Sequence, residues 1–132
     1  MSISEPDAAP TEFERWLADE FAATGAFTAL VMLVEIADTK VTPLCSTYLN
    51  VVGDEVVWLD IVVMFAGSGV NWNGAAFFPV TAPEGGPLDN PTARTQLHAL
   101  EARLDEDRLV LNEGFFFDAA GRRLKIEEAS VP

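Results

Sequence analysis

Two carboxylates interrupt apolar segments of this sequence, and they have the clearest potential for chemistry. Glu35 lies within Ala26–Ala37, and Asp60 lies within Val56–Phe65. Carboxylates are seldom buried unless they are paired or functional. Two such groups on one surface could act as general acid and general base, as in glycoside hydrolysis. Asp60 and Glu35 are therefore the candidate catalytic residues, and a pocket built on Asp60 requires that this residue be buried.

Other reactive residue types are scarce. Zinc sites need three or four protein ligands, mostly Cys or His, and the chain has one of each, Cys45 and His98. Cys45 lies in an apolar strand segment, which is typical of an inert thiol, and His98 is expected on the surface of a helix. The acidic run 105–107 begins like a calcium loop, but Val110 stands where that loop needs glycine. We therefore expect no metal and no cofactor.

The glycine-rich segment Gly67–Gly74 offers a contact surface rather than a phosphate site. Its glycines at positions 69 and 74 have the spacing of a P-loop, but Ala75 and Ala76 replace the lysine and the hydroxyl residue that a P-loop needs. A tryptophan flanked by two amides can anchor an interface or stack on a ring. It can equally fold back onto the core. The candidate binding residues are Asn71, Trp72 and Asn73.

A helix that begins at Thr11 is the first element expected to position these groups. Thr11 and Glu14 have the spacing of a capping box, and Gly25 stands where a C-terminal cap is expected. The large apolar residues of this helix share one face: Phe13, Trp16, Leu17 and Phe21.

Strands are expected to follow this helix. The segments rich in β-branched residues are Ala26–Ala37, Val41–Val52 and Glu55–Phe65. Asp38-Thr39 and Gly53-Asp54 are expected as their hairpin turns. Pro43 indicates an edge strand or a bulge.

The predicted turns fix a register. Asp60 would face Thr47 beside the pair Cys45 and Val62, whereas Glu35 would lie opposite Thr42 on the other side. The two carboxylates then cannot converge. In the structural alternative, each lies at an edge of the sheet or hydrogen-bonds a neighbour, as Asp60 would with Thr47. Catalytic and structural roles both stay open.

The same register leaves both faces of the predicted sheet largely apolar. A sheet with one face in water alternates more cleanly between apolar and polar residues, so each face must be covered. Helices can cover one face, and a second subunit or a wrapped hairpin can cover the other. This argument predicts a homodimer.

The second half of the chain is predicted to continue the sheet. Its expected elements are a strand Ala75–Val80 after an Asn73-Gly74 turn, a loop Ala82–Asn90, a helix from Asn90-Pro91 to about Asp105, and strands Arg108–Phe117 and Arg122–Glu128 around a turn at 118–121. Strands and helices do not alternate regularly, so a parallel sheet is not expected. We predict an α+β fold with an antiparallel sheet of five to six strands and two helices, in the order α-βββ(β)-α-ββ.

The length of the chain and of its apolar segments limits the classes of protein to which it can belong. The 132 residues suit a single domain, which we expect over residues 11–132 after a disordered lead at residues 1–10. The lead is acidic and lacks the apolar core of a signal peptide, and no apolar segment reaches the ~20 residues of a membrane helix. A cytoplasmic protein without membrane contact is expected.

The net charge is −13, although 49% of the residues are hydrophobic. Such a charge repels nucleic acid but attracts a basic protein partner; it can also serve only solubility or adaptation to salt. In layout, size and acidity the chain resembles the small acidic secretion chaperones. The sequence favours a non-enzymatic protein-interaction domain of the chaperone, inhibitor or immunity kind. The alternative is a small-molecule or enzymatic pocket that uses Asp60.

Overall fold

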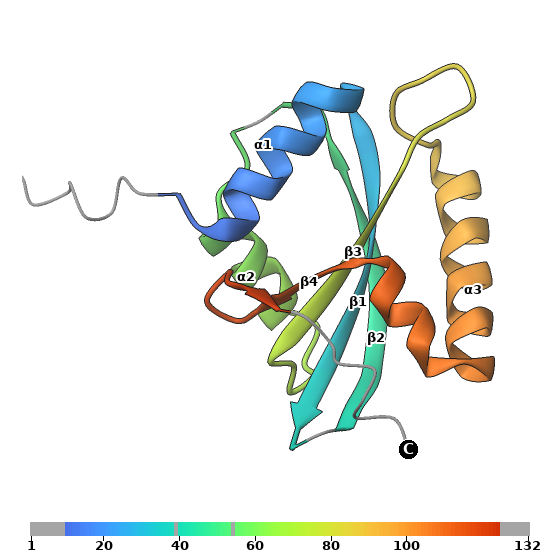
Figure 1. The fold of residues 1–132 in the computed structure, drawn as a ribbon. Coiled ribbons are helices and arrows are strands. Elements are labelled where there is room, and N and C mark those ends of the chain that lie inside the picture. Colours follow the sequence, from blue (N-terminus) through green and yellow to red (C-terminus); the bar gives the residue numbers. More distant parts are fainter. Residues whose placement is uncertain (1–9, 39, 54, 125–132) are drawn as a thin grey trace, which may run out of the picture.

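The fold is α+β, with one antiparallel sheet between two layers of helices (Figure 1). The computed structural model describes residues 10–38, 40–53 and 55–124, so most of the predicted disordered lead lies outside the described residues. The elements are α1 Glu12–Thr24, β1 Phe27–Ala37, β2 Lys40–Val51, α2 Trp58–Ala66, β3 Gly74–Val80, α3 Asn90–Glu106, the 3-10 helix η2 Arg108–Glu113, β4 Phe115–Asp118 and β5 Arg123–Leu124. The five strands lie in the order β2-β1-β3-β4-β5, which confirms the predicted fold class.

The alternation of β1 builds two cores, one on each face of the sheet. On one face, Ala29, Val31 and Leu33 pack with side chains of α1 and α2. On the other face, Leu30 and Met32 pack with side chains of α3 and η2. Because β1 is covered on both faces, its residues Phe27–Val34 are all buried.

The first helix forms as its sequence indicates. The Thr11 hydroxyl accepts the Glu14 N–H at 3.0 Å, and a Glu14 carboxylate oxygen accepts the Thr11 N–H at 2.9 Å. The other oxygen of Glu14 accepts the N–H of Trp58 at 2.7 Å. Since Val57, the N-cap residue of α2, makes no capping bond with its side chain, Glu14 stabilises the start of both helices.

The segment Glu55–Phe65 is not the predicted third strand, because most of it forms α2. Trp58, Ile61 and Phe65 lie at helical spacing and bury one face of α2 against the sheet. Val51 therefore pairs with Phe27, Cys45 pairs with Leu33, and the predicted pairs of β2 with residues 56–63 do not form. Burial of an apolar helix face outweighs the modest strand preference of valine.

Both faces of the sheet are covered by helices of the same chain. The predicted homodimer rested on a face without its own cover, and α2 removes that premise.

Other predicted elements need smaller corrections. Pro43 does lie on an edge strand, and a bulge interrupts the register between Leu33 and Val34. Asp89, not Asn90, caps α3. The predicted strand Arg108–Phe117 begins as η2, because Val110 and Leu111 pack in the core between the sheet and α3.

Candidate functional site: an apolar surface on α2

The predicted catalytic carboxylates are exposed. Asp60 lies in the first turn of α2, where the helix dipole favours a negative charge. Glu35 lies near the end of β1 and pairs with Thr42, as its predicted register requires. No described hydrogen bond joins Asp60 to Thr47. Exposure of Asp60 removes the burial on which the pocket hypothesis relied.

The other reactive residues are also separated. Cys45 is half-buried at the margin of the core between the sheet and helices α1 and α2, and His98 is exposed on α3, across the sheet. Among the described residues, no three Cys, His, Asp or Glu side chains are grouped so as to hold a metal ion.

The glycine-rich segment contributes one packed and one bonded side chain. Trp72 is half-buried and stacks edge-on against Phe65 of α2, with ring centroids 5.2 Å apart. The Asn73 side chain accepts the N–H of Ile36 at 2.7 Å and donates to its carbonyl at 2.9 Å, and so continues the ladder of β1. Asn71 is exposed. All three candidate binding residues are therefore at least partly accessible, although the exposed Asn73 amide is already bonded to Ile36.

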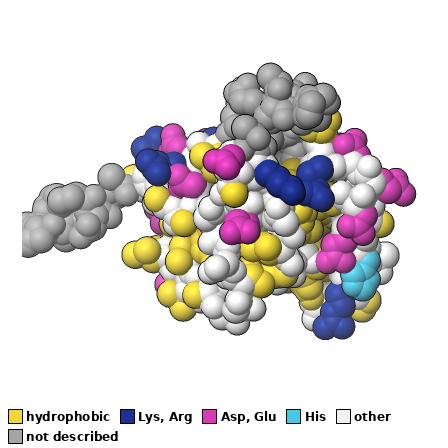
Figure 2. Space-filling view, turned by 90° about the horizontal axis from the view of Figure 1, so that it is seen from below, with side chains coloured by type: hydrophobic (Ala, Val, Ile, Leu, Met, Phe, Trp, Pro, Cys, Tyr) yellow, Lys and Arg dark blue, Asp and Glu magenta, His cyan; other side chains and the backbone are white. Residues whose placement is uncertain are grey.

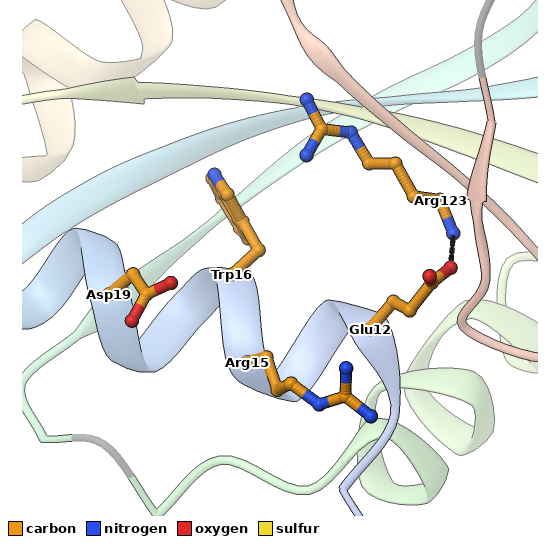
Figure 3. Close-up of a pocket in the computed structure, with 5 residues that line it drawn as sticks. All are labelled: Glu12, Arg15, Trp16, Asp19 and Arg123. Carbon is orange, nitrogen blue, oxygen red and sulfur yellow. Dashed lines mark hydrogen bonds between the residues drawn. The ribbon is translucent and has the colours of Figure 1, made fainter.

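A shallow charged pocket lies beside α1 (Figure 3). It has a volume of about 270 Å³ and is lined by Glu12, Arg15, Trp16, Asp19 and Arg123. The Arg123 N–H donates to Glu12 at 2.5 Å, and its guanidinium lies over the Phe115 ring. The buried indole N–H of Trp16 has no hydrogen-bond partner among the described residues. The lining charges have both signs and so favour no one class of ligand, and neither Asp60 nor Glu35 belongs to the lining.

The outward face of α2 is the most unusual surface of the described residues. Leu59 is 69% exposed and Val63 is 71% exposed, one helical turn apart. All large hydrophobic side chains that are exposed in the described residues come from residues 52–64: Val52, Val57, Leu59, Val63 and Met64. Four of them belong to α2 or to its N-cap, and we call these four, Val57, Leu59, Val63 and Met64, the α2 surface. A helix that is apolar all round normally lies buried, so α2 has a face that lacks a partner within the described structure.

The stretch of sequence that contains α2 is acidic. Asp60 is the one charged residue of α2. No Lys or Arg occurs between Lys40 and Arg94, whereas Glu and Asp occur five times there. Seen from below, hydrophobic side chains gather on the side of the molecule away from His98, where α2 lies (Figure 2). The arrangement can attract and bury an apolar segment that carries basic residues.

The sequence contains the helical spacing that predicts this site, but its β-branched residues favoured the interpretation as a strand. The buried residues of α2 recur at i, i+3 and i+7, which is helical spacing. Leu59 and Val63, on the opposite side of that helix, then have to be exposed. Among the described residues, no helix is both long and apolar enough to cross a membrane. Comparison with known proteins finds no matching family model, no matching curated protein and no matching solved structure.

Proposed function

We propose that this chain is a non-enzymatic protein-interaction domain, which binds a basic protein partner through the α2 surface. The observation that carries the proposal is the exposed apolar face of α2, centred on Leu59 and Val63. Exposed apolar patches on single domains mark interaction sites. The cytoplasm is the expected compartment, and an inhibitor, immunity or chaperone role would fit such a domain.

Charge supports a basic partner. The chain has a net charge of −13, and Asp60 lies in the first turn of α2, next to Leu59 in the sequence. Opposite charges speed association, and apolar contacts then hold the complex. Trp72 packs against Phe65, so Asn71 and Trp72 extend the surface at the C-terminal end of α2.

The first experiment is native mass spectrometry of the protein gently purified from its host, which identifies a bound basic protein. The recovered partner is then titrated with Val63→Asp and, as a matched control, Ala99→Asp. Ala99 is exposed on α3, on the other face of the sheet, so the control adds the same charge elsewhere. We expect Val63→Asp to weaken binding by about 30-fold or more and Ala99→Asp to leave it nearly unchanged.

Equal binding by the two variants would exclude the α2 surface as the docking site. Circular dichroism of both variants shows whether each keeps its fold, and Val63→Ser replaces Val63→Asp if the latter unfolds. A homodimer also remains a proposal, and because both faces of the sheet are covered, its contact does not involve a bare sheet face.

A further inference from the structure

β2 is an edge strand of the sheet, and its outward side is a different surface from the α2 surface. β2 spans Lys40–Val51 at one end of the sheet, whereas the described part of β5 at the other end spans Arg123–Leu124. An edge strand presents unpaired N–H and C=O groups along one side. Their positions on β2 can be derived from the neighbouring strands.

The bonds of Asn73 show which way the backbone of β1 points. Both backbone groups of Ile36 bond to the Asn73 side chain, and the Val34 carbonyl accepts the Asn73 N–H at 3.0 Å. Asn73 leads directly into β3, so these even-numbered residues of β1 direct their groups toward β3. Alternate residues of a strand point to opposite sides, so Ala29 and Val31 point toward β2.

The pairing of β1 with β2 shows which residues of β2 direct their backbone groups toward β1. Ala29 pairs with Leu49, and Val31 pairs with Thr47. These β2 residues bond to β1, so the residues between them point outward. The backbone groups at the open edge are therefore those of Ser46, Tyr48 and Asn50, and no other described segment bonds to them.

One half of this edge is protected and the other half is not. Lys40, Pro43 and the bulge at Leu44 obstruct pairing along the first half, and the Arg108 guanidinium donates to the Val41 carbonyl at 2.8 Å. Charges, prolines and bulges are the usual devices that block an edge. The segment Cys45–Val51 has none of them and carries no charged residue.

We propose that Cys45–Val51 pairs antiparallel with the same segment of a second copy of this chain. Tyr48 then lies opposite Tyr48 of the second copy, and Ser46 lies opposite Asn50. This register pairs every outward residue between the bulge and the end of β2, and it joins the two sheets into one. A second copy is favoured because the segment is self-complementary: about a two-fold axis through Tyr48, every outward backbone donor meets an acceptor of the same segment. The Glu101 carboxylate, which accepts the Ser46 hydroxyl, lies beside this edge in both copies, so salt that screens its charge favours the pairing.

The test is sedimentation equilibrium of the full chain with a matched pair of variants, Ser46→Pro and Ser46→Ala. Both variants lose the side-chain hydrogen bond from Ser46 to Glu101, but only proline also removes the outward N–H. We expect wild type and Ser46→Ala to dimerise in about 0.5 M NaCl, where screening is strong. Ser46→Pro is expected to raise the dimer Kd by about 100-fold, because two bonds are lost per dimer.

A monomeric wild type under these conditions, or an unchanged Kd for Ser46→Pro, would overturn the proposal. Hydrogen exchange of the wild type decides the question if Ser46→Pro does not fold. Protection that rises with protein concentration at Ser46, Tyr48 and Asn50, but is constant at Thr47 and Leu49, supports pairing at this edge. Concentration-independent exchange at the first three amides contradicts it. Val63→Asp leaves this edge intact, so loss of the α2 complex and loss of the dimer are distinguishable.

Discussion

At the scale of single residues, Glu14 has two separate tasks. One carboxylate oxygen completes the capping box of α1, and the other accepts the Trp58 N–H at the start of α2. Glutamine can complete a capping box but offers one acceptor oxygen. We expect Glu14→Gln to lower the free energy of unfolding by about 1–2 kcal/mol, because it leaves one donor poorly paired.

Urea denaturation measures this loss, and Glu14→Ala should cost more, since it removes both bonds. Glu20→Gln on the same helix is the charge-matched control and should change stability little. If Glu14→Gln matched Glu20→Gln, the bond to Trp58 would contribute nothing to stability.

At the scale of elements, the start of α3 depends on an ionised cap. The side chain of Asp89 accepts the N–H of Thr92 at 2.8 Å. Two hydrogen bonds from Thr92 lower the pKa of Asp89 below its ordinary value of 3.8. The bond from the Thr92 side chain has the larger effect, and the bond from its backbone N–H has the smaller one. Because the pKa is lower in the folded state, this contribution to stability is present above pH ~4 and is lost as the pH falls through the folded value.

Asp89→Asn tests this dependence, since asparagine caps a helix without titrating. Thermal unfolding of wild type and variant is compared between neutral pH and pH ~3. We expect the melting temperature of the wild type to fall further than that of the variant over the acidic part of the range. Parallel curves would show that Asp89 does not contribute to the acid sensitivity.

At the scale of the whole molecule, the charge of −13 affects the two proposed interactions in opposite ways. Added salt screens attraction to a basic partner, so binding at the α2 surface should weaken. The same salt screens repulsion between two acidic copies, so pairing at the β2 edge should strengthen. We expect the two dissociation constants to shift in opposite directions, by about tenfold each, between low and physiological salt.

Titrations at several NaCl concentrations measure both constants on one protein preparation. A dimer that weakened with salt would contradict pairing through a neutral edge, since such pairing has no attraction between charges to lose. A partner complex that was insensitive to salt would contradict a basic partner.

The sequence by itself determined those helices and strands whose caps, turns and apolar spacing lie within a few residues of each other. The capping box at Thr11, the glycine at the end of α1, and the apolar seam of α3 were all predictable, and the structure confirms them. The same holds for β1, β3 and the antiparallel α+β class. These features follow from backbone geometry and side-chain periodicity, which the sequence states directly.

Only the tertiary structure decided the state of residues 58–66 and, with it, the candidate site. These residues are rich in valine, so local propensity favours a strand. The strands of the sheet are already paired with one another, however, and the sheet offers this segment an apolar face to pack against. Packing of Trp58, Ile61 and Phe65 on that face, together with the distant carboxylate of Glu14, makes the segment a helix. A helix buries Ile61 and exposes Leu59 and Val63 on its opposite side, whereas a strand would have placed all three side chains on one face of the sheet. Such a choice depends on contacts between segments far apart in the chain, and no local pattern contains them.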